Sequence, residues 1–257
     1  SRHPYKRWLR DNARYIEGSF DGESAPGTSA AELDTYQKMF QVSFEERDQV
    51  LRPLAESGNE AVGSMGDDTP LAVLSARDRS LYDYFRQKFA QVTNPPIDPL
   101  RESIVMSLEV DLGGEGNIFA EVEDHAYRVS LTSPVLSQGK FNTLLNIEDE
   151  KLKIADIDAT YDPENGNLRS AVEGLCLTAE TAVRNGATLL ILSDRQLGQN
   201  RLPIHSLLAT GAVHHHLIRS GLRADANLII ESGSARDSHH FACLLGFGAT
   251  AVYPYLA

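Results

Sequence analysis

Three short apolar runs decide the fold of this chain: ATLLILSD (Ala187–Asp194), ANLIIES (Ala226–Ser232) and ATAVYPY (Ala249–Tyr255). They are rich in β-branched residues and lack strict alternation, which is typical of strands buried on both faces of a parallel sheet. Each run follows a segment of helix length that ends near a glycine. With the earlier run LKIADID (Leu152–Asp158), the order becomes β-α-β-α-β-α-β. This order predicts an α/β fold, most simply a partial or degenerate (β/α) TIM-barrel-like domain.

The segments between these runs have the period of helices. One apolar stripe precedes Ala187–Asp194 and comprises Leu168, Val172, Leu175, Ala179, Ala182 and Val183. Asn185-Gly186 is a typical stop signal after it. The last helix should begin at Asp237 or Ser238, either of which can accept a backbone N–H as an N-cap, and should run to Gly246.

Composition limits the class of protein. The chain has 257 residues, 42% hydrophobic and 23% charged, which suits one large globular domain or one and a half ordinary ones. A net charge of −12 without a basic run argues against nucleic acid or an anionic membrane as a partner. No stretch has the ~18 consecutive apolar residues of a transmembrane helix, and the N-terminus does not resemble a signal peptide. We therefore expect a cytoplasmic protein.

The N-terminal part is expected to be helical. Residues 1–30 have little apolar periodicity and indicate an arm or linker, and the chain opens like a piece of a longer protein. Two helices should follow from Leu33, the second starting at a capping box in which Ser43 and Glu46 satisfy each other's backbone N–H groups. A further helix is predicted from Ser80 through Phe89 and Val92, with an apolar stripe.

A proline-rich loop should end that helix. Thr93-Asn94-Pro95-Pro96-Ile97-Asp98-Pro99 holds three prolines in five residues, which fixes a stiff, extended path suited to the wall of a site or passage. After it we expect a strand over 103–108, another over 127–132 and a short helix near 141–145. The domain would then divide into a helical part, 31–100, and a β/α part, 101–257.

A glycine-rich loop with two carboxylates, Gly63-Ser64-Met65-Gly66-Asp67-Asp68, precedes the helix predicted at residue 80. Two close carboxylates can perform acid–base chemistry or bind a hard cation. A solvated turn in which an aspartate caps the next segment explains the same residues, and we favour that interpretation.

Polar residues at the carboxyl ends of the predicted strands are the stronger candidates, because sites of barrel proteins form at that edge. The set comprises Asp158, Ser193, Asp194, Arg195, Glu231, Ser232, Arg236 and Tyr253. Arg195 and Arg236 suit an anionic ligand, with Asp194 and Glu231 holding them in ion pairs. A purely internal salt-bridge layer explains these residues equally well.

Histidines and cysteines give weaker signals. His214, His215 and His216 point about 100° apart on a helix, so a shared metal site is less favoured than a helix surface with one packed histidine. His239 and His240 are best explained as neutral packing residues at a helix start. Cys176 and Cys243 indicate buried free thiols.

Four segments resemble the central domain of the glutamate synthase large chain, and the likeness spans nearly the whole chain. They are GSMGDDTPLAVLS (Gly63–Ser75), LYDYFRQKFAQVTNPPIDPLRE (Leu81–Glu102), LILSDR (Leu190–Arg195) and ARDSHHFACLLGFGATAVYPYLA (Ala235–Ala257). The amino-acid sequence of these segments resembles the bacterial NADPH-dependent type more than the ferredoxin-dependent type.

The resemblance implies a domain between two active sites. In the family, an amidotransferase domain hydrolyses glutamine, and ammonia crosses a tunnel to a domain with FMN and a 3Fe-4S cluster, where it is used with 2-oxoglutarate to form glutamate. The NADPH type adds a small electron-donating subunit with FAD. Residues 1–30 would link to the amidotransferase domain and 31–257 would be the central domain. Thr93, Asn94, Pro96 and Ile97 would line the tunnel entrance, and residues 63–68 would face another domain.

The family's catalytic features have no counterpart in this sequence. Residue 1 is Ser rather than the family's nucleophilic Cys, no cysteine trio for a cluster is present, and residues 231–234 lack the glycine density of a flavin-phosphate loop. We therefore expect a fragment without catalytic residues, bound cofactor or metal. The alternative is a stand-alone barrel-like enzyme or binder of a small anionic ligand, which bound FMN would reveal.

Overall fold

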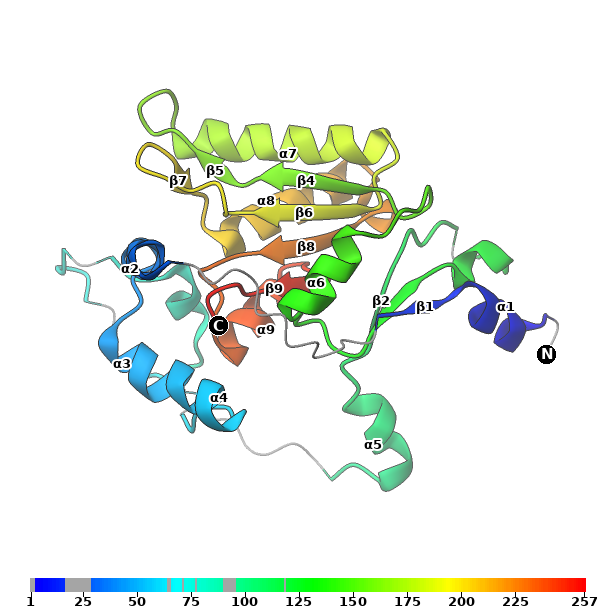
Figure 1. The fold of residues 1–257 in the computed structure, drawn as a ribbon, viewed down its shortest axis with the longest axis horizontal. Helices are drawn as coiled ribbons and strands as arrows, with labels where there is room; N and C mark the ends of the chain where they lie inside the picture. Colours follow the sequence, from blue (N-terminus) through cyan, green and yellow to red (C-terminus); the bar gives the residue numbers. More distant parts are fainter. Residues whose placement is uncertain are drawn as a thin grey trace.

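A four-stranded parallel sheet forms the centre of the computed structural model, which describes residues 3–16, 29–63, 66–70, 72–76, 78–89, 96–117 and 119–257. Its strands are β4 (Ile154–Asp158), β6 (Leu189–Ser193), β8 (Asn227–Glu231) and β9 (Ala251–Tyr253), in the spatial order β4-β6-β8-β9 (Figure 1). All three pairings are parallel. The four strands predicted from the apolar runs are confirmed, and the chain is a mixed α/β protein.

Three helices connect these strands in turn: α7 (Leu168–Arg184), α8 (Ser206–Arg219) and α9 (Ser238–Gly246). As predicted, α7 is followed by Asn185 as C-cap and by Gly186 at a left-handed φ of 87°. At the start of α9, the side chain of Asp237 accepts the backbone N–H of His240. Cys176 and Cys243 lie on α7 and α9 as free thiols; Cys176 is buried as predicted, whereas Cys243 is only half-buried.

Each face of the sheet has its own hydrophobic core, as expected for strands whose successive side chains point to opposite faces. Leu190, Leu192 and Ile230 pack with residues of α7, α8 and α9. On the other face, Leu189, Ile191 and Ile229 pack with α6 (Gln138–Leu145) and with a small second sheet. Figure 1 shows α8 behind the sheet and α6 in front of it.

The small sheet has the order β1-β3-β2 and combines β1 (Arg14–Tyr15), β3 (Val129–Leu131) and β2 (Val110–Leu112). β3 and α6 confirm the strand and the helix predicted in this region. β1 follows α1 (Tyr5–Asn12), so residues 3–16, where the sequence indicated an arm, form a helix and a strand that pairs with β3.

The helical part begins with α2 (Ala30–Met39), followed by α3 (Phe44–Glu46), a π-helical turn over Arg47–Leu51 and α4 (Arg52–Ser57). Gly58 ends α4 in the left-handed conformation, at φ 65°. The capping box predicted at Ser43 forms only in part. Ser43 accepts the N–H of Glu46, but the Glu46 carboxylate is turned away to an ion pair with Arg236.

Over residues 80–89, the part of this segment that the structure describes, the long helix predicted from residue 80 does not form, and Val92 lies outside the described residues. A 3₁₀ turn, η2 (Leu81–Phe85), is present instead, and the chain is extended at Arg86. Tyr82 anchors the turn because its side chain is completely buried. Gln87 then pairs with Gly66 in a parallel bridge and accepts the N–H of Asp67. These long-range contacts outweigh the local helical pattern.

The strand predicted over 103–108 is also wrong, because α5 (Pro99–Val105) is a helix. Asp98 caps it by accepting the N–H groups of Leu100 and Arg101, and Pro99 occupies the first helical position. Both are standard start signals that outweigh the β-branched residues that follow. α5 lies away from the sheet in Figure 1.

The remaining short elements are η3 (Glu123–Ala126), β5 (Thr160–Tyr161), β7 (Leu202–Pro203) and η4 (Arg223–Asp225), with β5 and β7 paired antiparallel. None of the helices in the described part of the chain has the length and apolar character needed to cross a bilayer.

Candidate functional site

The predicted polar residues meet at one edge of the sheet. The strand register places Asp158 beside Ser193, Ser193 beside Glu231, and Glu231 beside Tyr253, all at the last positions of their strands. The carboxyl ends of neighbouring parallel strands lie at the same edge of the sheet, so the residues that end these strands form a row, as the sequence predicted. Asp194, Arg195 and Ser232 follow directly after the strands and extend it.

Glu231 is the centre of one half of this edge. One of its carboxylate oxygens accepts a hydrogen bond from Nε of Arg195 at 3.0 Å, and the other accepts a hydrogen bond from the Ser193 hydroxyl at 2.7 Å. The Arg195 guanidinium also lies over the Tyr255 ring, 3.8 Å from its centroid, in a cation–π contact. The predicted pair of Arg195 and Glu231 is therefore present, and both side chains already have partners within the chain.

Asp194 has a different environment from the one predicted. It is buried and accepts the hydroxyls of Ser232 and Tyr255, each at 2.6 Å, and the N–H of Gly233 at 3.2 Å. Burial raises the pKa of Asp194 to about 6, and these three hydrogen bonds partly oppose that rise. Neither arginine of the predicted cluster is its partner.

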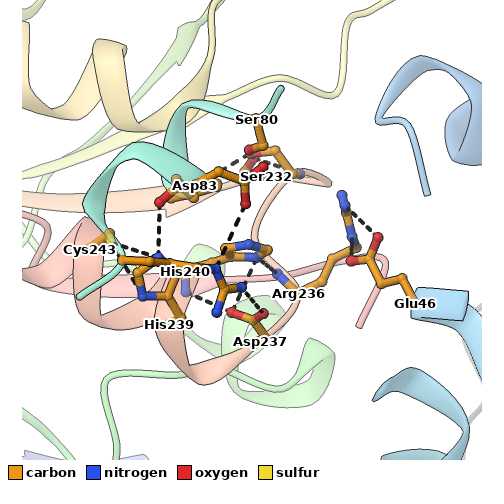
Figure 2. A network of polar contacts seen from close by, with 12 residues as sticks. Glu46, Ser80, Asp83, Ser232, Arg236, Asp237, His239, His240 and Cys243 are labelled. Atoms are coloured by element: carbon orange, nitrogen blue, oxygen red, sulfur yellow. Dashed lines mark hydrogen bonds and ion pairs between the residues drawn. The ribbon is translucent and has the colours of Figure 1, made fainter. Parts of the chain in front are cut away.

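Arg236 instead binds a residue from the helical part. Its Nε and Nη2 donate to the two oxygens of Glu46 at 2.6 and 3.0 Å (Figure 2). Its Nη1 donates to the carbonyl of Gly233 at 3.1 Å. The Arg236 side chain is only 7% exposed. The sequence gives no signal for Glu46 as a site residue, because a capping box with Ser43 accounts for it locally.

A chain of hydroxyl groups continues from Asp194 into the core. Ser232 contacts Ser234 at 2.9 Å, Ser234 contacts Ser206 at 2.7 Å, and Ser206 contacts the Tyr82 hydroxyl at 2.7 Å. Burial raises the pKa of Tyr82 to about 12. The network is therefore made of neutral groups at its inner end.

Two histidines enclose Tyr82. The ring of His240 stacks on it at 4.3 Å between centroids, and that of His205 lies at 4.8 Å. Nδ1 of His240 accepts the backbone N–H of Arg236, and Nδ1 of His205 accepts that of Leu207. An accepting ring nitrogen carries no proton, so both rings are neutral, and burial lowers both pKa values to about 4. His240 is the packing residue that the sequence predicted.

Three further histidines make local contacts. His214 accepts from Arg223 at 2.9 Å, and His216 lies 2.6 Å from Glu180 on α7. His239 contacts the carbonyl of Tyr82 at 2.9 Å and lies near Cys243, as Figure 2 shows. Within the described ranges, no group of three or more metal-binding side chains comes together.

The edge of the sheet does not fit a flavin phosphate. The backbone N–H groups of residues 232–234 already donate to Tyr253, Asp194 and Ser232. A Cβ atom at Gly233 would lie 2.5 Å from the Phe40 ring, so this side chain covers the loop. The pocket beside Asp194 and Glu231 has a volume of about 10 Å³, far below the ~300–1,000 Å³ of ordinary ligand pockets.

The two predicted loops are described in part. Thr93, Asn94, Ser64 and Met65 lie outside the described residues. Pro96 and Ile97 are exposed immediately before the Asp98 cap of α5.

In the glycine-rich loop, Gly63 is exposed and Gly66 takes part in the bridge to Gln87. Asp67 accepts from Thr69, which lowers its pKa, and Asp68 is exposed. These contacts agree with the favoured solvated turn.

The family model described as "Glutamate synthase central domain" matches residues 35–257. The chain belongs to this family. It is 44% identical over 262 residues to the ferredoxin-dependent glutamate synthase of Oryza sativa subsp. japonica, covering 100% of this chain and 16% of that protein.

Two bacterial relatives are equally similar. The NADPH glutamate synthase large chain of Bacillus subtilis is 43% identical over 255 residues, covering 99% of this chain and 16% of the relative. That of Azospirillum brasilense is 44% identical over 260 residues, with 99% and 17% covered. The chain therefore spans about a sixth of the length of these relatives, which include both ferredoxin-dependent and NADPH-dependent enzymes.

Proposed function

We propose that this chain is a non-catalytic central domain of a glutamate synthase, which joins a glutamine-hydrolysing domain to an FMN-containing synthase domain. The observation that carries the proposal is the family match over residues 35–257. The strand-end edge supports the absence of catalysis, because its carboxylates, arginines and backbone donors already have partners within the chain, Arg236 through Glu46 of the helical part.

The proposed parent reaction converts glutamine, 2-oxoglutarate and two reducing equivalents into two molecules of glutamate. Hydrolysis of glutamine gives one glutamate and ammonia, and reductive amination of 2-oxoglutarate with that ammonia gives the other. FMN and a 3Fe-4S cluster would belong to other domains, with NADPH reaching them through a small FAD subunit, or ferredoxin acting directly. We propose a cytoplasmic enzyme for the NADPH type.

The role proposed for this domain is to form part of the wall of an ammonia passage. Thr93, Asn94, Pro96 and Ile97 are the proposed lining residues. Two features support it: three prolines stiffen residues 95–99, and the exposed Ile97 leads directly into the capped start of α5. A stiff loop suits the wall of a passage for a small neutral molecule.

The surface of α5 and the residues after it supports contact with other domains. Leu100, Ile104 and Val105 on the helix are 87%, 78% and 58% exposed, and Met106 and Leu108 are 63% and 64% exposed. Exposed apolar residues gathered in one segment are typical of interaction surfaces. We propose that α5 and the loop at residues 63–68 face the amidotransferase or FMN domain of the same polypeptide.

We also propose that the α/β part is a degenerate barrel. Its sequential strand order, with α7, α8 and α9 against one face, is the local pattern of a (β/α) barrel. The opposite face, which would line a barrel interior, packs against α6 and the small sheet. This filling supports a scaffold role rather than a ligand-binding one.

Visible absorbance of the purified 257-residue chain, with titrations of FMN and 2-oxoglutarate, tests the non-catalytic assignment. We expect no flavin absorbance and no saturable binding of either compound. Stoichiometric binding of FMN or 2-oxoglutarate would overturn it, and Arg195→Ala and Arg236→Ala would then show whether the strand-end edge is responsible.

A further inference from the structure

Asp194 is a buried carboxylate held without a cation. Its side chain is 98% removed from solvent, and no ion pair within the described residues includes it. A buried carboxylate is costly unless hydrogen bonds compensate for the lost water. Here three neutral donors do so: the Ser232 hydroxyl, the Gly233 N–H and the Tyr255 hydroxyl.

These donors come from two loops at the carboxyl edge of the sheet. Ser232 and Gly233 begin the loop between β8 and α9, and Tyr255 follows β9. Two hydroxyls and a backbone N–H that converge at this edge of parallel strands form a donor set suited to the oxygens of a small anion. The set binds both oxygens of Asp194: Oδ1 accepts from Tyr255 and Gly233, and Oδ2 accepts from Ser232.

The donor set is closed to an anion from outside. The Phe40 ring and the Leu256 side chain lie where a Cβ atom of Gly233 would be, at 2.5 and 2.9 Å. The rings of Tyr36 and Phe40 also meet the Tyr255 ring edge-on, at 6.1 and 6.3 Å between centroids. Helix α2 therefore covers the loop, and the anion that contacts the donors is the chain's own Asp194 carboxylate.

We infer that Ser232, Gly233 and Tyr255 form an oxyanion cradle that the protein fills from within, with the Asp194 carboxylate in the place of a small carboxylate or phosphate ligand. This inference deepens the proposed non-catalytic role, because it names the group that blocks the strand-end edge. It also assigns a ligand class to the emptied cradle, namely anions of formate or phosphate size.

Asp194→Ala in the 257-residue chain tests the inference. Three donors then lose their acceptor, which should lower Tm by roughly 5–10 °C. Sodium formate should restore at least half of this loss in a saturable way, whereas sodium chloride at equal ionic strength should not. Asp156→Ala removes an exposed carboxylate from β4 and is the matched control, with no difference expected between the two salts.

If formate and chloride raise the Tm of folded Asp194→Ala equally, the inference is overturned. The proposed function is tested separately, by the flavin titration of the unchanged chain. If Asp194→Ala does not fold, Tyr255→Phe gives the test, since it keeps the carboxylate and removes one donor. Carbon-13 NMR should then show a higher pKa for the Asp194 carboxyl than in the unchanged chain. An unchanged pKa would equally overturn the inference.

Discussion

Arg236 and Glu46 lie 190 residues apart in the sequence and form an ion pair with two hydrogen bonds, of 2.6 and 3.0 Å. The pair attaches the helical part of the chain to the loop that follows β8. The Arg236 side chain is almost completely buried, and Glu46 is its carboxylate partner among the ion pairs of the described residues. Removing Glu46 would therefore leave a buried positive charge without a carboxylate partner, which is destabilising.

We predict that Glu46→Ala lowers the free energy of unfolding by about 2–4 kcal/mol, as expected for breaking a largely buried ion pair. Urea denaturation measures this change. Glu45→Ala is the matched control on the same helical turn, where an exposed carboxylate should contribute less than ~0.5 kcal/mol. Similar losses in the two variants would show that the ion pair does not hold the two parts together.

Close packing of Phe40 on Gly233 predicts a strong effect of a single methyl group. Gly233→Ala should cost about 1–3 kcal/mol, because the added Cβ would lie 2.5 Å from the Phe40 ring. Gly174→Ala, inside α7 with no atom within 4 Å of the added Cβ, should instead stabilise by about 0.5–1 kcal/mol. Thermal or urea unfolding of both variants checks the opposite signs.

A second change distinguishes packing from other causes. Phe40→Leu should recover part of the cost of Gly233→Ala in a double-mutant cycle, because the smaller side chain makes room for the methyl group. Purely additive effects of the two changes would contradict the proposed contact between α2 and the β8–α9 loop.

Buried titrating groups predict a specific dependence of stability on pH. His205 and His240 have pKa values lowered from 6.5 to about 4, so below pH 6.5 the unfolded chain binds protons that the folded chain does not. Stability should therefore fall as the pH decreases from 6.5 towards 4. Asp194 acts in the opposite direction, because its pKa is raised from 3.8 to about 6 and its folded form holds a proton over that interval.

Asp194→Asn should remove this opposing contribution. Between pH 6 and 5 we predict that the free energy of unfolding of this variant falls with decreasing pH about twice as steeply as that of the unchanged chain. In both chains the unfolded state binds about two extra protons, at His205 and His240, but only in the unchanged chain does the folded state bind one extra proton, at Asp194. Urea denaturation at closely spaced pH values gives both slopes. Parallel slopes would mean that Asp194 does not titrate in this range.

The sequence predicted the sheet and its polar edge because both depend on local patterns. Apolar runs such as Leu189–Ser193 specify buried strands, and the parallel order then brings Ser193 and Glu231 together. Partner choice was not predictable in the same way. Arg236 had Asp194 and Glu231 nearby in the expected fold, but Glu46, far away in sequence, lies closer in the structure.

Local patterns also failed where tertiary contacts decide. The apolar stripe after Leu81 resembles a helix, yet burial of Tyr82 and the bridge from Gly66 to Gln87 hold the chain in a short turn and an extended segment. At Pro99–Val105 a local signal prevails instead: the N-cap at Asp98 favours a helix, although the β-branched residues Ile104 and Val105 favour a strand. Asp98 and Pro99 carry this start signal in the sequence itself.

We propose that this domain couples two active sites, and the stoichiometry of the products tests this role most directly. In a full-length glutamate synthase that carries this domain, Ile97→Ala should let ammonia escape, so the yield falls from two glutamates per glutamine consumed towards one. Val73→Ala, another exposed apolar residue, is the control and should keep the ratio at two. If Ile97→Ala still forms two glutamates per glutamine consumed when the 2-oxoglutarate step limits the overall rate, this loop has no role in coupling.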